Sequence, residues 1–147
     1  MIMVTETTTA LLIRPAIAFG LIIGLYELFL IHADENFRGS HWFGHGLQSV
    51  IIAIIAVFVT MNTAYFLNVT GLDNMGIPFI SNYYLVNLAV VLIFAVKVYS
   101  VSAVVKGASG RGMHEKWYHI LIVAVLVYAS PIIYQYTQAF LPPLITG

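Results

Sequence analysis

The residues best suited to chemistry are the five histidines, which all lie in or beside two polar segments of the chain. Acidic residues share these segments. Neutral imidazole and carboxylate groups together suit zinc, iron or copper. A transition metal (Cu, Zn or Fe) is therefore the cofactor that this pattern could hold. The candidate metal ligands are His32, Asp34, His41, His45, Glu115 and His119.

The spacing of these residues gives partial support to a metal site. His41 and His45 are four positions apart, as are Glu115 and His119. On a helix such pairs share one face, which is the geometry of half a metal site. However, the repeated Glu-x-x-His of di-iron bundles is absent, and so is the His-Glu-x-x-His of zinc proteases. Histidines are also common where a membrane meets water, so a metal-dependent membrane enzyme is one alternative among several.

Two charged residues, Glu27 and Lys97, lie inside long apolar stretches. A charge in the hydrocarbon of a bilayer costs about 2.5–3.5 kcal/mol even on the mild scale. Counting the helical rise puts the two side chains at similar depths. We therefore predict an intramembrane ion pair between Glu27 and Lys97. The alternatives are that Lys97 extends to the membrane edge, that the pair serves a proton or ion path, or that it contacts a neighbouring subunit.

Other kinds of site find little support in the sequence. The chain has no cysteine, which excludes disulfides, thiolate metal sites and thiol nucleophiles. No nucleophile stands beside a plausible base and orienting group. There is no phosphate loop, dinucleotide fingerprint or nucleic-acid motif. We therefore predict no catalytic residue and no nucleic-acid partner.

The elements that must position these residues follow from composition. Of 147 residues, 61% are hydrophobic and 8% are charged, against about 25% charged in a soluble domain. A bilayer core needs roughly 20 apolar residues in a helix, and four stretches meet this length. They are 10–32, 47–67, 82–105 and 117–140. These stretches predict an all-α polytopic membrane protein. Because the polar connections between them are short, the four transmembrane helices should form an up-down bundle, in one domain that covers 1–147.

Small and polar residues predict how these helices pack. Small residues recur on one face of each of the first two stretches and allow close approach, within the bundle or against another subunit. They are Ala16, Gly20, Gly24, Ser49, Ala53, Ala56, Thr60 and Thr63. Pro131 is predicted to bend the fourth helix after Ser130. Asn62 and Asn87 are predicted to hydrogen-bond across helices or to another subunit.

Basic residues predict the orientation in the cell membrane. An even number of spans puts both termini on one side, where Arg14 is the only basic residue. The first and third loops hold Arg38, Lys106, Arg111 and Lys116. Because cytoplasmic loops carry an excess of Lys and Arg, we predict that these loops are cytoplasmic and that both termini lie outside.

The segment 32–45, HADENFRGSHWFGH, resembles membrane segments of the copper membrane monooxygenases, in the archaeal ammonia monooxygenase branch. The size of the chain also resembles that of the small accessory subunits of those complexes. The copper-bearing subunit of the family uses Asp-x3-His, and this motif is not matched. Arg38 stands four residues after Asp34, and Ile77 four residues after Asp73. The resemblance therefore implies a non-catalytic companion chain, and no ligand is carried over.

Three functions remain open from the sequence. The first is a non-catalytic integral membrane subunit, whose partners are the lipid bilayer and either other membrane subunits or further copies of itself. The second is a small oligomeric ion channel or transporter that uses Glu27 and Lys97. The third is a membrane enzyme with a metal held by histidine and carboxylate side chains.

Overall fold

A computed structural model describes residues 10–33, 42–103 and 116–146, and the side chains of these ranges except at 42–45 and 101–103. This part of the chain is helical and contains no strand, which confirms the predicted all-α class. The long helices are α1 (Ile13–Ala33), α2 (Trp42–Met61), α4 (Tyr83–Ala103) and α5 (Trp117–Thr137). The shorter ones are α3 (Thr63–Thr70), η2 (Leu72–Asn74), η3 (Gln138–Phe140) and α6 (Pro143–Thr146).

Three described segments are single helices long and apolar enough to cross a membrane. They are Ile13–Ala33, Tyr83–Ser100 and Trp117–Phe140. A fourth crossing is possible only if Gly46–Met61 and Thr63–Thr70 count together, because these helices meet at an angle of 60°. The sequence predicts one continuous helix over 47–67, and the structure divides it at Asn62.

The break at Asn62 has a local cause. The backbone N–H of Asn62 donates to Val59 O (3.2 Å), a shortened turn that leaves Phe58 O without its usual helical donor. The side-chain Nδ2 of Asn62 donates to Phe58 O instead (2.8 Å). Asn62 O then accepts from the backbone N–H of Phe66 (3.0 Å), which begins α3. An asparagine side chain thus replaces one helical hydrogen bond and stabilises the change of direction.

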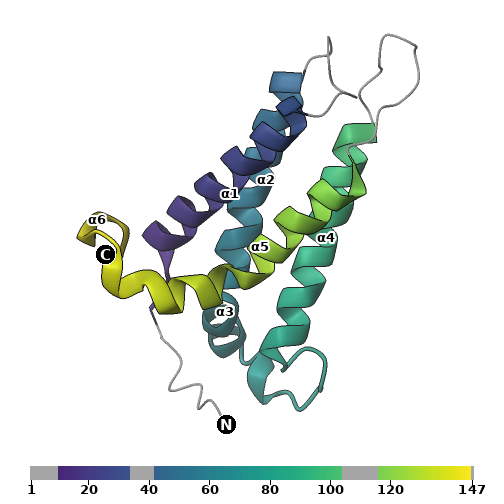
Figure 1. The fold of residues 1–147 in the computed structure, drawn as a ribbon. Helices are drawn as coiled ribbons and strands as arrows, with labels where there is room; N and C mark the ends of the chain where they lie inside the picture. The colour runs from purple at the N-terminus through teal and green to yellow at the C-terminus, as the bar shows by residue number, and fades with distance from the viewer. Residues whose placement is uncertain (1–9, 34–41, 104–115, 147) are drawn as a thin grey trace.

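The long helices form a bundle in which α2 contacts each of α1, α4 and α5. Figure 1 shows α1 and α2 running side by side, and α5 passing close to α4 on the other side of the bundle. At the far end, α3 turns away below α2, and α6 returns beside the beginning of α1. Because α2 is central, residues on its several faces can reach every other long helix.

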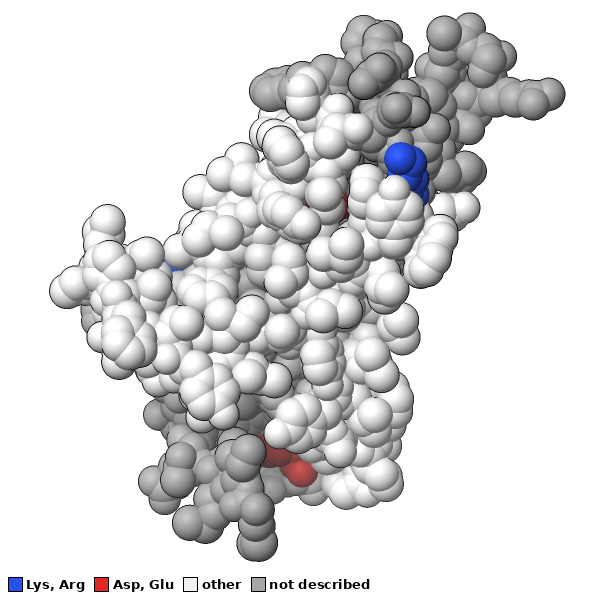
Figure 2. All heavy atoms as spheres, viewed as in Figure 1, with Lys and Arg blue, Asp and Glu red and all other residues white. Residues whose placement is uncertain are grey.

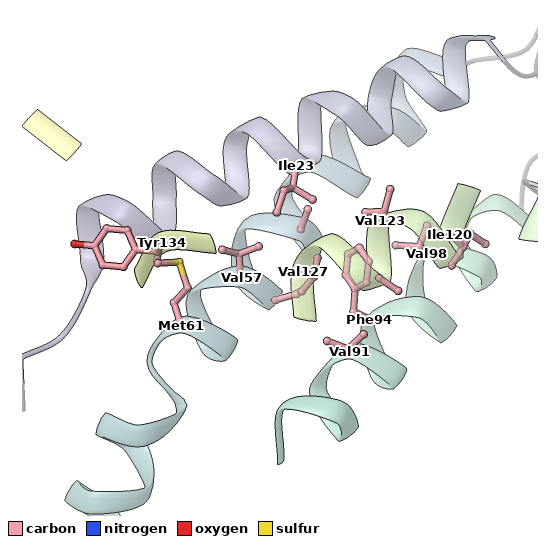
Figure 3. Packing of buried hydrophobic residues seen from close by; sticks show 14 residues of the cluster. Ile23, Val57, Met61, Val91, Phe94, Val98, Ile120, Val123, Val127 and Tyr134 are labelled. Carbon is pink, nitrogen blue, oxygen red and sulfur yellow. The ribbon is translucent and has the colours of Figure 1, made fainter. Parts of the chain in front are cut away.

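Apolar side chains fill the space between the helices. Figure 3 shows Ile23 of α1, Val57 of α2 and Val127 of α5 pointing toward a common interior. Val57 and Val127 have none of their surface exposed. The outward faces are apolar as well: Ile22 and Ile93 are each 64% exposed, and Figure 2 shows a flank that is almost free of charged atoms. Such a surface is the one that a lipid environment favours.

Candidate functional site: a buried polar junction

The small-residue faces predicted on the first two helices are buried inside the bundle. Ala16, Gly20 and Gly24 are buried on α1, and Ser49, Ala53, Ala56, Thr60 and Thr63 are buried on α2 and α3. A Cβ atom at Gly20 would lie 2.6 Å from Ile54 Cα, and one at Gly24 would lie 2.8 Å from Val50 Cα. The helix backbones therefore meet directly, an approach that only glycine allows.

Glu27 and Lys97 occupy different environments. Glu27 is on the same face of α1 as the glycines and has none of its surface exposed. Lys97 is exposed on α4. The ion pair predicted between Glu27 and Lys97 therefore stays a prediction. The helical rise gives the position of each residue along its helix but not its direction around the helix axis. Phe94 and Val98 mark the buried face of α4, and Lys97 lies outside that face.

Five buried polar side chains form the most distinctive site in the described chain. They are Thr60, Asn62, Thr63, Asn87 and Ser130, each 2% exposed or less. We call this group the polar junction. It lies where the α2–α3 break faces α4, α5 and the segment that enters α1.

Asn62 connects the break to the start of α1. Its Oδ1 accepts from the backbone N–H of Leu12 (2.6 Å), and its Nδ2 lies 3.3 Å from Leu12 O. Leu12 directly precedes α1, where backbone N–H groups have no helical partner. One amide thus satisfies both backbone groups of Leu12 while also bonding Phe58 O.

Thr63 and Asn87 connect the break to α4. The Thr63 hydroxyl lies 2.8 Å from Val59 O and hydrogen-bonds the side-chain amide of Asn87. Asn87 Nδ2 in turn donates to Thr60 O (3.4 Å). These bonds connect the broken helix to α4 and give the buried side chains of Thr63 and Asn87 their hydrogen-bond partners in an apolar interior.

Thr60 and Ser130 connect α2 to α5. Because Pro131 has no N–H, the carbonyl of Val127, four residues earlier, loses its helical donor. Ser130 Oγ donates to Val127 O (2.8 Å), and Thr60 Oγ1 lies 3.4 Å from both Val127 O and Ser130 Oγ. α5 passes through Pro131 as one helix. The sequence predicted an effect of Pro131 but not that Ser130 would bond the carbonyl group that Pro131 leaves without a donor. A serine directly before a proline in an apolar helix is the sequence feature that could have indicated this bond.

Ser130→Ala is expected to lower the free energy of unfolding by about 0.5–1.5 kcal/mol, the range for such hydrogen bonds in bundles. The reason is that Val127 O keeps only its longer contact with Thr60. In a Pro131→Ala background the loss should be smaller, because the new N–H at position 131 can donate to Val127 O. Unfolding in mild detergent measures both costs. Equal costs in the two backgrounds would show that Ser130 does not compensate for the proline.

The predicted metal ligands are only partly within the described chain. His32 is exposed near the end of α1, and His119 is half-buried in the first turn of α5. Asp34, His41 and Glu115 lie outside the described residues, and the side chain of His45 is not described. Among the described side chains, no three metal-ligating residues form a group. The metal site therefore stays a prediction.

Comparison with known proteins gives no match to a family model, a curated protein or a solved structure. The class of protein is accordingly defined by the fold and the site together. The described part of the chain is all-α. It has three helices long and apolar enough to cross a membrane, or four if the bent pair α2–α3 counts as one span. Its buried polar groups are concentrated where those helices meet.

Proposed function

We propose that the chain is a multi-pass integral membrane protein and a non-catalytic subunit of a larger membrane complex. In this proposal the bent pair α2–α3 forms the second of four spans in an up-down bundle. Both termini then lie outside, and the loops that follow α1 and α4 are cytoplasmic. The resemblance of segment 32–45 makes a copper membrane monooxygenase the first complex to test.

The observation that carries this proposal is how the polar junction uses its side chains. Asn62, Asn87 and Ser130 each bond within the chain, to backbone groups or to one another. Their hydrogen bonds connect the α2–α3 break to the residue before α1 and to α4, and link α2 to α5. A bundle fixed in this way, with an apolar exterior, suits a scaffold that packs against other membrane-embedded chains.

Purification in mild detergent from native membranes tests the proposal. We expect other membrane subunits to co-purify in fixed ratio with the tagged chain, because its apolar outer faces would be partly covered by them. An unrelated four-span protein of similar size, carrying the same tag, is the matched control. Recovery of the chain as a monomer without partners would overturn the proposal.

Cross-linking can then show which face meets a partner. The chain contains no cysteine, so single cysteines can be placed at Ile22 on α1 and Ile93 on α4, which are equally exposed. Cross-links to a partner from one position and not the other would identify the contacting helix. Cross-links between identical chains alone would point to a homo-oligomer.

A second candidate function, a small ion channel or transporter, has one observation in its favour. Broken helices are frequent at the ion sites of transporters, and α2–α3 is bent by 60°. The fully buried Glu27 would then belong to the pathway. Flux into vesicles that is abolished by Glu27→Gln and altered by Lys97→Met would favour this candidate, while flux unaffected by both would exclude it.

A further inference from the structure

A surface groove runs between α4 and α5. It has a volume of about 470 Å³. Its floor includes the buried Val91 and Ile120, and its walls include Leu92 and Leu121, which are more than half exposed. Almost all of the lining is apolar. The groove therefore suits an apolar occupant, either a hydrocarbon chain or the apolar face of a helix.

The size of the groove decides between a single hydrocarbon chain and a helix. The lining extends along α5 from Trp117 to Tyr128, a rise of about 16 Å. A whole helix of that length and about 10 Å in diameter occupies about 1,250 Å³, so only one face of a helix could enter the groove, whereas a single extended chain can lie inside it along its whole length. A single extended chain fits better. The length also matches one leaflet, about half of the 30 Å hydrocarbon core.

One end of the groove has the chemistry of a membrane surface. Trp117 lines it there and is 70% exposed at the first turn of α5. Lys116 directly precedes it, with its Nζ 6.0 Å from the centre of the Tyr118 ring. Tryptophan and tyrosine concentrate at the level of lipid headgroups, and lysine there attracts anionic lipids. The groove thus combines an apolar lining of one-leaflet length with an exposed tryptophan at one end and a lysine directly before that tryptophan in the chain.

We infer that this groove binds one acyl chain of an anionic phospholipid, with the phosphate of the lipid beside Lys116 and Trp117. The inference rests on the proposed placement in a membrane and goes beyond the subunit function, since it names a lipid as a specific ligand. It also assigns the mouth of the groove to the predicted cytoplasmic leaflet, where anionic lipids are enriched.

Tryptophan fluorescence tests the site directly. The chain has two tryptophans, so Trp42→Phe leaves Trp117 as the only reporter. The variant is reconstituted into phosphatidylcholine vesicles that contain equal mole fractions of brominated phosphatidylglycerol or brominated phosphatidylcholine, whose bromines quench tryptophan on contact. We expect phosphatidylglycerol to bind beside Trp117 about fivefold more tightly, the preference that one lysine near the surface provides.

Three variants in this background separate the parts of the site. Lys116→Gln should reduce the preference to about onefold. Ala95→Phe, which fills the groove, should reduce quenching by both lipids, whereas Ile93→Phe, on α4 outside the groove and 64% exposed, should leave it unchanged. Circular dichroism checks that each variant is folded, and Lys116→Gln keeps the test valid if Ala95→Phe does not fold.

Other outcomes would overturn the inference. Equal quenching by both lipids before any substitution would show that the lipids merely surround the protein. Quenching that Ala95→Phe leaves unchanged would show the same. If neither lipid quenches Trp117, the proposed membrane placement itself fails. A cross-link from Ala95→Cys to another subunit, together with equal quenching by the two lipids, would show that a protein helix occupies the groove.

Discussion

Gly20→Ala is expected to lower the free energy of unfolding by about 1–3 kcal/mol, the usual cost of overpacking a buried position. The added Cβ atom would lie 2.6 Å from Ile54 Cα, which is a backbone atom and cannot rotate away. α1 and α2 must therefore separate, and their whole interface loosens. The better helix propensity of alanine, worth about 1 kcal/mol, offsets only part of this. Gly24→Ala should behave similarly, since its Cβ would lie 2.8 Å from Val50 Cα.

Gly46→Ala is the matched control, because it lies in the same pair of helices. Its Cβ would meet Leu28 Cδ1, the far end of a flexible side chain that can turn aside. Thermal unfolding in mild detergent, followed by circular dichroism, compares the variants. The loss should be clearly larger at position 20 than at position 46. An unchanged or raised stability for Gly20→Ala would contradict the direct contact of the two backbones.

The long helices could be predicted from the sequence because their signal is local. Apolar stretches of sufficient length place α1, α4 and α5 within a few residues of their observed bounds. The small-residue spacing likewise marks the face of α1 that is buried, since residues four positions apart share one side of a helix. These features depend on neighbouring residues and require no knowledge of distant contacts.

The break in the second helix could not be predicted in this way. The stretch 47–67 is apolar enough on average to span a bilayer although Thr60, Asn62 and Thr63 interrupt it, so its mean hydropathy gives no sign of a bend. The bend combines the local bond from Asn62 to Phe58 O with partners far away in the sequence: Leu12, 50 residues before Asn62, and Asn87, 24 residues after Thr63. The sequence did predict that Asn62 and Asn87 hydrogen-bond across helices, but it could not show which residues are their partners.

The predicted Glu27–Lys97 pair depends on more than the depth of each residue in the membrane. Counting residues gives depth along a helix but not the direction in which a side chain points around the axis. α4 is apolar on nearly all sides, so its sequence does not reveal which face is buried. Val91, Phe94 and Val98 mark that face in the structure, and Lys97 lies beside it on the exposed surface.

Asn62→Ala is expected to lower the free energy of unfolding by at least about 2 kcal/mol. Three backbone groups lose a partner: Leu12 N–H, Leu12 O and Phe58 O. Each buried group left unsatisfied costs about 1–3 kcal/mol, although water reaching the end of α1 reduces the sum. Unfolding in mild detergent measures the total. Hydrogen exchange at the Leu12 amide measures the connection to α1, and that amide should lose its protection.

Asn68→Ala is the matched control, because Asn68 is an exposed asparagine on α3. Its replacement should change stability by less than about 0.5 kcal/mol, as is usual at the surface. Equal effects at the two positions would contradict the role given to Asn62. A loss of stability without faster exchange at Leu12 would separate two functions of this side chain. It would mean that Asn62 stabilises the bend between α2 and α3 while the start of α1 is held by other contacts.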